Sequence, residues 1–219
     1  MNTILITGTN RGIGLELCKQ LVARGDSVIA VCRRASNDLQ ALDLRIIDGI
    51  DVCSREGIIS LQTQLGDEGL DWLINNAGIL SVEALDSLDF DAMERQFRVN
   101  ALGPLRVTAA LLPNLSAGAK IGIITSRMGS VEDNTSGGYY GYRMSKAAVN
   151  MAGMSLACDL RDREVAVTLL HPGMVATDMT GGQGVSPAHS ASGLIRRMDA
   201  LNMSTSGSFW HAEGERLPW

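Results

Sequence analysis

The sequence is poor in aromatic residues and carries no excess of positive charge. Phe, Trp and Tyr together make up 4% of the 219 residues, too few for the aromatic platforms on which proteins stack single-stranded nucleic acid. Nineteen Lys and Arg residues against 24 Asp and Glu residues give a net charge of −5. Proteins that bind nucleic acid or an anionic membrane surface carry the opposite sign, so we expect neither as a partner.

Long apolar runs and clusters of metal ligands are also missing. No apolar run reaches the ~18 residues of a transmembrane helix, and the first residues lack the basic and apolar regions of a signal peptide. The 4 cysteines are scattered without a CxxC pair, and the 3 histidines do not cluster with them. This pattern predicts neither a disulfide framework nor a metal site, and it favours a cytoplasmic protein with reduced thiols.

What the chain does contain is an alternation of short apolar strands and helices. Apolar residues make up 45% of the sequence and charged residues 20%, as in ordinary folded proteins. Fully apolar strands that alternate with helices indicate a parallel sheet covered on both faces, and the right-handed crossover rule then favours a doubly wound α/β (Rossmann) fold. The predicted strands cover residues 2–7, 27–32, 44–50, 72–75, 120–126, 165–171 and 208–210, and the predicted helices cover 15–22, 56–65, 90–112, 142–161 and 188–201.

No linker, change of composition or internal repeat divides the chain. We therefore expect a single domain over residues 1–219, in which residues 178–205 form a short loop and helix on the substrate side. This region follows the sixth predicted strand, at the sheet edge where ligands bind in such folds. Its short length argues against a long, enclosed substrate pocket.

A glycine-rich turn joins the first predicted strand to the first predicted helix. Its sequence is TGTNRGIG at residues 7–14, with the spacing GxxxGxG at Gly8, Gly12 and Gly14. Glycines allow a pyrophosphate to approach the backbone at a helix N-terminus, where free N–H groups and the helix dipole favour an anion. A plain strand–helix connection can have the same composition, so the turn predicts a dinucleotide site only together with other motifs.

The residues after the second predicted strand indicate which dinucleotide is bound. An NAD enzyme holds an acidic residue there against the ribose hydroxyls, whereas this chain has Cys32, Arg33 and Arg34. A guanidinium without a neighbouring acid suits the 2′-phosphate of NADP(H), and Arg11 in the turn can reach the same group. The alternative is that Arg33 and Arg34 are solvated surface charges.

Two residues four apart form a candidate catalytic pair. Tyr142 and Lys146 begin a predicted helix, so both project from one face of it. A lysine beside a phenol stabilises the phenolate and lowers the pKa of the tyrosine, which could then exchange a proton with a carbonyl or alcohol oxygen. Ser126 ends the fifth predicted strand and could hydrogen-bond the same oxygen. Ser130 is the alternative, since it lies nearer to Tyr142 in the sequence.

These residues belong to a longer set of motifs that resembles the short-chain dehydrogenase/reductase family over the whole chain. Within that family the chain is most similar to sniffer-type carbonyl reductases and C-factor-like proteins, through NRGIG, CRR, EDNTSGGYYGYRMSK and the terminal LPW. The family motifs are TGTNRGIG at 7–14, Asp51-Val52, NNAG at 75–78, Val99-Asn100, Ser126, YRMSK at 142–146 and PGMVATD at 172–178.

The resemblance implies a role for each matched position. Tyr142 would be the general acid/base, Lys146 would tune it and bind the nicotinamide ribose, and Ser126 would orient the carbonyl. Asn100 would hold a water in a proton relay through Lys146. The cofactor contacts implied by the resemblance and by the two arginines are Gly8, Asn10, Arg11, Gly12, Ile13, Gly14, Arg33, Asp51, Val52, Asn75, Ala77, Gly78, Tyr142, Lys146, Pro172, Gly173, Val175 and Thr177.

The sequence thus favours an NADPH-dependent oxidoreductase that reduces a small aldehyde or ketone, or oxidises the alcohol. The alternative is a C-factor-like signalling or regulatory protein that binds NADP(H) with little turnover. A pure binding protein would not need Asn100, Ser126, Tyr142 and Lys146 together, which argues for the enzyme. The two long predicted helices, 90–112 and 142–161, form dimer interfaces in many members of the family, so a homodimer is expected, although carbonyl reductases can be monomers.

Overall fold

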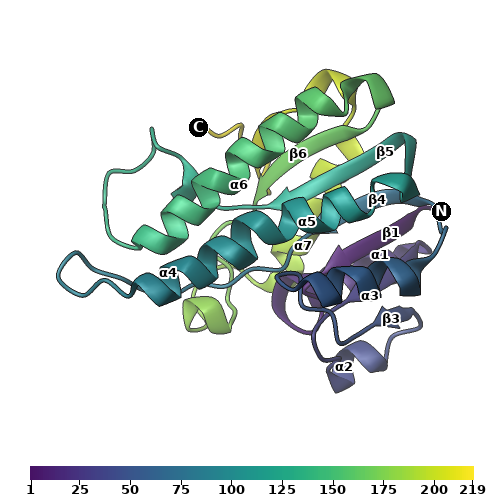
Figure 1. Ribbon diagram of the computed structural model, residues 1–219, viewed down its shortest axis with the longest axis horizontal. Helices are drawn as coiled ribbons and strands as arrows, with labels where there is room; N and C mark the ends of the chain where they lie inside the picture. The colour runs from purple at the N-terminus through teal and green to yellow at the C-terminus, as the bar shows by residue number, and fades with distance from the viewer.

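A seven-stranded parallel sheet forms the centre of the protein (Figure 1). The computed structural model describes residues 1–219. The strand order is β3-β2-β1-β4-β5-β6-β7, which is that of a Rossmann fold, because the chain starts in the middle of the sheet, winds to one edge and then returns to the other. The strands are β1 (Thr3–Thr7), β2 (Ser27–Val31), β3 (Arg45–Ile47), β4 (Leu70–Asn75), β5 (Leu115–Ile124), β6 (Ala166–His171) and β7 (Ser208–His211).

Helices cover both faces of the sheet (Figure 1), and alternate residues of each strand pack against one face or the other. In β1, Leu5 belongs to the core under α3, α5 and α6, whereas Ile4 and Ile6 belong to the core under α1 and α7. Both faces are therefore buried, which explains the continuous apolar strands. The helices are α1 (Gly12–Arg24), α2 (Asn37–Gln40), α3 (Arg55–Leu65), α4 (Phe90–Phe97), α5 (Gly103–Ala110), α6 (Tyr140–Asp159) and α7 (Pro187–Ala200).

The predicted single α/β Rossmann domain is confirmed, but the predicted helix over 90–112 is not continuous. A π-helical turn, Arg98–Leu102, separates α4 from α5. The side chain of Asn100 in this turn receives the backbone N–H of Ile79 at 2.9 Å and donates to the carbonyl of Ile79, also at 2.9 Å. We attribute the wider turn to this long-range pairing, because such turns accommodate one extra residue where a side chain has a partner outside the helix.

Other elements also differ from those predicted, and the predicted strand over 44–50 is shortened to Arg45–Ile47. Strand β5 begins at Leu115 instead of residue 120, because Leu115 pairs with Leu70 of β4 before the register shifts. Helix α2 was not predicted, since it has only four residues and one buried apolar side chain, Leu39. None of the helices is both long and apolar enough to cross a membrane.

Candidate active site

The glycine turn brings backbone against backbone at the end of β1. A Cβ atom on Gly8 would lie 2.8 Å from the Cα atom of Ala77, and one on Gly14 would lie 2.2 Å from the carbonyl oxygen of Gly8. Only glycine fits at both positions, and Gly8 also has a φ of +72°. Helix α1 starts directly after the turn, and its N-cap residue, Arg11, makes no side-chain cap bond. The first N–H groups of α1 are thus left for another acceptor.

A cavity of about 440 Å³ opens at the carboxyl ends of the strands, next to this turn. This is the sheet edge at which doubly wound folds bind ligands. The expected cofactor residues that line it are Gly8, Asn10, Arg11, Gly12, Ile13, Gly14, Arg33, Asp51, Val52, Ala77, Gly78, Tyr142, Lys146, Pro172 and Thr177. The structure brings them together although they come from six separate segments of the chain.

Asn75, Gly173 and Val175 do not line the cavity, although the motifs predicted that they contact the cofactor. The amide of Asn75 instead donates to the Thr108 hydroxyl of α5 at 3.1 Å, so it ties β4 to a helix. The residue of the NNAG motif that reaches the cavity is Asn76, and its amide donates to the carbonyls of Thr7 and Gly8 at 2.9 and 3.0 Å. Cofactor contact by Asn75, Gly173 and Val175 therefore remains a prediction.

Several lining residues were not predicted. They are Val31, Ile50, Asn76, Ile79, Val99, Ile124, Thr125 and Ala176. Cys32 also lines the cavity, at the expected ribose position, and Asp178, Met179 and Pro187 line it from the segment expected on the substrate side. Most are apolar residues at or just beyond the strand ends, and their position in the sheet rather than a motif brings them to the cavity. These lining residues could therefore have been predicted only with knowledge of the strand order in the sheet.

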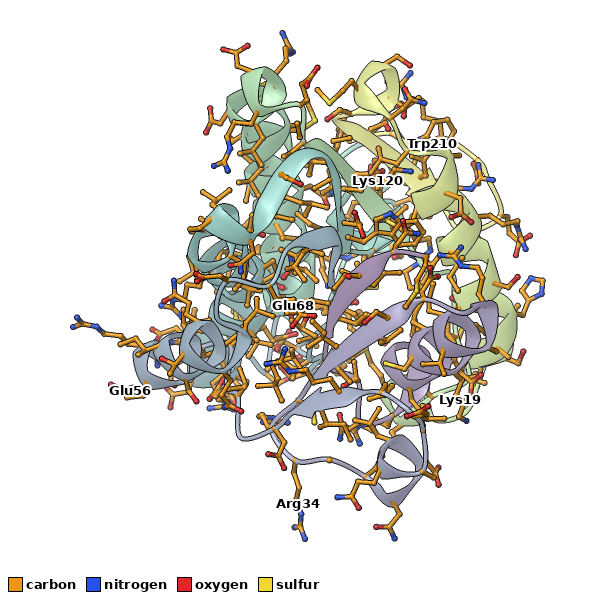
Figure 2. The ribbon with its side chains drawn as sticks, turned by 90° about the vertical axis from the view of Figure 1, so that its right-hand side faces the viewer. Lys19, Arg34, Glu56, Glu68, Lys120 and Trp210 are labelled. Carbon is orange, nitrogen blue, oxygen red and sulfur yellow. The ribbon has the colours of Figure 1, made fainter.

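The three candidate arginines are placed differently. Arg33 lines the cavity, whereas Arg34 is exposed and projects away from the body of the protein (Figure 2). Arg11 lies in the wall opposite the loop after β6 and forms an exposed ion pair with Asp178, with a distance of 2.6 Å between Nη1 and Oδ2. Cys32 is buried at the end of β2, and no acidic residue takes its place. The cavity thus has a cationic end that fits a phosphorylated ribose.

Of the four candidate catalytic residues, Tyr142 and Lys146 line the other end of the cavity, whereas Ser126 and Asn100 are not among its lining residues. Tyr142, in the first turn of α6, lies close enough to the Ser126 hydroxyl just after β5 for that hydroxyl to affect its pKa, and the Lys146 ammonium lies 5.6 Å from the centre of the Tyr142 ring. Lys146 Nζ donates to the carbonyl of Ile124 at 3.0 Å. All three side chains are buried. The alternative serine, Ser130, accepts the backbone N–H of Asp133 at 3.1 Å, and no contact links it to Tyr142.

Burial controls the ionisation of this group. It raises the pKa of Tyr142 to about 12, although the Ser126 hydroxyl acts in the opposite direction. Burial also lowers the pKa of Lys146 to about 8. The sequence predicted that Lys146 would lower the pKa of Tyr142, whereas the structure gives the opposite direction, because loss of hydration of the phenolate outweighs the effect of the Ser126 hydroxyl. Tyr142 is therefore a neutral phenol at physiological pH, a form that can donate a proton.

Asn100, in the π-helical turn, forms hydrogen bonds next to Tyr142 and Lys146. Its amide donates to the hydroxyl of Ser145, which lies between Tyr142 and Lys146 in α6, at 3.0 Å. A Cβ atom on Gly78 would be 3.4 Å from Asn100 Oδ1 and 3.7 Å from Lys146 Nζ. The side chain of Asn100 thus bonds Ile79 and Ser145 and joins three segments around Lys146, and its predicted role in holding a water remains a prediction.

These features fit a bound NADP(H) molecule. The glycine turn leaves α1 N–H groups free for a pyrophosphate, Arg33 provides a cation next to Cys32, where an acidic residue would otherwise stand, and Tyr142 and Lys146 line the far end. The comparison with known proteins agrees. The model of the family described as short chain dehydrogenase matches residues 2–185. The chain belongs to this family.

Two proteins are similar in sequence to this short-chain dehydrogenase. The 1-hydroxy-2-glutathionyl-2-methyl-3-butene dehydrogenase of Rhodococcus sp. (strain AD45) is 44% identical over 226 aligned positions, covering 100% of both chains. The C-signal protein of Myxococcus xanthus is 50% identical over 154 positions, covering 68% of this chain and 93% of that protein. The predicted similarity to C-factor-like proteins is thereby confirmed.

Solved structures give the same result. The carbonyl reductase Sniffer of D. melanogaster superposes with a TM-score of 0.90 at 30% identity, covering 100% of both chains. The NADPH-bound carbonyl reductase from chicken fatty liver superposes with a TM-score of 0.89 at 31% identity, covering 100% of this chain and 99% of the other. The chain is thus a short-chain oxidoreductase similar in sequence and fold to carbonyl reductases.

Proposed function

We propose that this protein is an NADPH-dependent reductase of small aldehydes or ketones, able to oxidise the corresponding alcohols in reverse. The observation that carries the proposal is the buried contact of Ser126 with Tyr142, beside Lys146, at one end of a cavity whose other end holds the glycine turn and Arg33. The segment 178–205, which contributes Asp178, Met179 and Pro187 to the cavity wall, would cover the substrate side.

The chain's own residues would handle the carbonyl oxygen. Because Tyr142 is a neutral phenol up to a pKa of about 12, its hydroxyl can give a proton to the oxygen as negative charge develops there. The Ser126 hydroxyl would bind the same oxygen and fix its direction. Lys146, whose pKa is about 8, would carry its positive charge below that pH and favour the phenolate left behind. When bound, the nicotinamide supplies the hydride for the carbonyl carbon.

The choice of NADPH over NADH rests on charge at the ribose end of the cavity. Buried Cys32 offers no carboxylate to bind a 2′-hydroxyl or to repel a 2′-phosphate, and Arg33 supplies a cation. A charge-assisted hydrogen bond contributes roughly 1.5–3 kcal/mol, which corresponds to about tenfold to hundredfold in affinity. The NADPH complex of the chicken carbonyl reductase supports this choice.

The decisive experiment is a screen of aldehydes and ketones with NADPH and NADH, repeated with Tyr142→Phe. We expect NADPH to be used in preference, and Tyr142→Phe to bind NADPH normally but to lose about 10²- to 10⁴-fold in kcat. The Rhodococcus relative is named as a dehydrogenase of a glutathionyl-substituted alcohol, so the panel includes such an alcohol in the oxidative direction. Near wild-type rates for Tyr142→Phe, or equal kcat/KM for both cofactors at low salt, would contradict the proposal.

The C-signal relative keeps a signalling role as the alternative. A binding protein has no use for a buried lysine and a buried tyrosine that are costly to desolvate, and this cost favours the enzyme. The alternative would be supported by tight NADPH binding without oxidation of NADPH by any carbonyl of the panel.

We also propose that two copies pair through the α5 and α6 faces. Leu102 and Leu105 are exposed at the start of α5, and Met151 is exposed on α6. Large exposed apolar side chains can mark protein–protein contact surfaces when they form a patch. Light scattering at micromolar concentration tests this assignment, and a monomer mass would overturn it.

A further inference from the structure

Helix α6, which carries Tyr142 and Lys146, begins without a cap of its own. Its N-cap residue, Tyr139, makes no side-chain cap bond and has a left-handed backbone with φ of +52°, which costs energy for a residue with a Cβ atom. A helix of this length usually begins with a Ser, Thr, Asp or Asn that accepts a first-turn N–H group. Here the N–H of Gly141 donates instead to Oε2 of Glu83, at 3.2 Å.

Glu83 lies in the segment between β4 and α4 and is only 2% exposed. Its Oε1 atom accepts hydrogen bonds from the Ser81 hydroxyl at 2.8 Å and from the Gln96 amide at 2.7 Å. Its backbone carbonyl accepts the N–H of Tyr139 at 3.0 Å. No Lys, Arg or His pairs with it. The buried carboxylate is therefore held by neutral donors and by the positive end of α6.

The residues around Glu83 also determine how closely α6 approaches α4. A Cβ atom on Gly141 would lie 2.5 Å from the amide nitrogen of Gln96 and 2.8 Å from Cγ of Met93. The two loops that precede α4 and α6 project from the same end of the molecule (Figure 1), and the Tyr139–Glu83 backbone bond joins them. The first turn of α6 is thus located by contacts with α4 and its loop.

Tyr142 directly follows Gly141, so any shift of this first turn moves the phenol relative to Ser126, which is held separately at the end of β5. We propose that Glu83 is a positioning residue: its carboxylate caps α6 from a distant part of the chain and thereby aims the Tyr142 hydroxyl at the reacting oxygen. Lys146 lies one turn further and is anchored by the Ile124 carbonyl. Loss of the cap should therefore change catalysis more than cofactor binding. The inference rests on the proposed function for the identity of the reacting oxygen.

The test compares Glu83→Ala, Glu83→Gln and the control Asp89→Ala. Asp89 is also a carboxylate that accepts a first-turn N–H, that of Ala92 at 2.9 Å, but it caps α4. We expect Glu83→Ala to lower kcat about tenfold or more, since a small misplacement of a catalytic group has effects of this size, while the Kd for NADPH stays within about twofold. Glu83→Gln keeps an oxygen for Gly141 but turns an amide donor toward the Gln96 amide donor, so it should recover kcat only in part. Asp89→Ala should change kcat little.

Folded Glu83→Ala with unchanged kcat, or with equal losses of kcat and cofactor affinity, would overturn the inference. If Glu83→Ala does not fold, Gln96→Ala, which removes a donor to the carboxylate, takes its place with the same expected split. If the wild-type protein reduces no carbonyl, the proposed function fails separately. Amide hydrogen exchange over residues 139–146 then decides: faster exchange in Glu83→Ala than in Asp89→Ala supports the capping role, and equal exchange overturns it.

Discussion

Two helix N-termini face the site, and the protein uses them in opposite ways. Helix α1 and helix α6 both begin at residues whose side chains make no cap bond. At α1 the first turn contains no acidic residue and its N–H groups border the cavity, so the terminus is free to take a phosphate. At α6 the carboxylate of Glu83 occupies the equivalent place. The same backbone electrostatics thus serves ligand binding in one region and rigidity in the other.

The difference extends to the ionisable groups. Around α6, burial displaces the pKa values of Tyr142, Lys146 and His171 strongly. The charged groups on the α1 side, Arg11 and Arg33, are exposed. The cofactor end therefore depends on accessible charge, and the catalytic end depends on desolvated groups held in place.

Among changes at the two helix starts, the largest expected effect comes from removing the accessible charge of Arg33 on the α1 side. Arg33→Ala should lower the preference for NADPH over NADH by about tenfold to hundredfold, because one charge-assisted hydrogen bond to a phosphate is lost. The ratio of kcat/KM for the two cofactors measures this, and NADH values should change little. Arg34→Ala is the matched control, since Arg34 projects into solvent (Figure 2). An equal effect of both variants would contradict the assignment.

A side chain added at Gly14, at the start of α1, should weaken NADPH binding about as much as Arg33→Ala does, or slightly less. In Gly14→Ala the new Cβ atom would lie 2.2 Å from the Gly8 carbonyl oxygen and 2.6 Å from the Asn76 amide, so the turn must shift. We expect a loss of about 1–3 kcal/mol in stability and weaker NADPH binding, measured by thermal unfolding and fluorescence titration. Gly69→Ala, whose Cβ atom would meet nothing within 4 Å, should be nearly neutral. Wild-type binding by Gly14→Ala would exclude the turn as the phosphate site.

A side chain added at Gly141, at the start of α6 that Glu83 caps, should lower turnover rather than cofactor affinity. Gly141→Ala places a Cβ atom 2.5 Å from the Gln96 amide, which should push the first turn of α6 away from α4. We expect kcat to fall about tenfold, with the Kd for NADPH almost unchanged, because Lys146 and the glycine turn stay in place. Steady-state kinetics together with cofactor titration separates the two quantities. A loss confined to cofactor affinity would contradict the assignment of the α6 start to catalysis and of the α1 start to cofactor binding.

The smallest expected effect concerns stability at acid pH. Burial and the neighbouring His211 lower the pKa of His171 to about 3, so this histidine is neutral in the folded protein, whereas the unfolded chain binds a proton near pH 6.5. Stability should therefore fall as the pH drops from about 6.5 toward 3, by about 1–2 kcal/mol at pH 5. Unfolding temperatures between pH 7 and 5 measure this, and His171→Asn should flatten the profile. An unchanged profile in His171→Asn would assign the effect to other groups.

The sequence predicted the parts of the molecule that depend on local pattern. Strands such as β1 and β2 are continuous apolar runs because both sheet faces are covered, and the glycine turn follows from spacing alone. The π-helical turn at Asn100 could not be predicted in this way, because its cause is a pairing with Ile79, 21 residues away. The cap of α6 depends on Glu83, 58 residues before Gly141, and no motif marks that distance.

The placement of individual site residues shows the same limit. Tyr142, Lys146 and Ser126 were predicted to meet, and they do, because helix spacing and a strand end are local features. The pKa of Tyr142 was expected in the wrong direction, since burial cannot be judged from a neighbour four residues along the helix. Asn76 was missed in favour of Asn75, because only the register of β4 decides which of two adjacent asparagines faces the cavity.

The ion pair between Arg11 and Asp178 links two segments of the cavity wall. It joins the glycine turn to the loop after β6, and both residues line the cavity. An exposed pair of this kind contributes only about 0–1 kcal/mol and weakens further in salt. A phosphate that recruits Arg11 would release Asp178, and the loop with it. If this cavity holds the proposed dinucleotide, salt should therefore make the loop after β6 easier to displace during cofactor exchange.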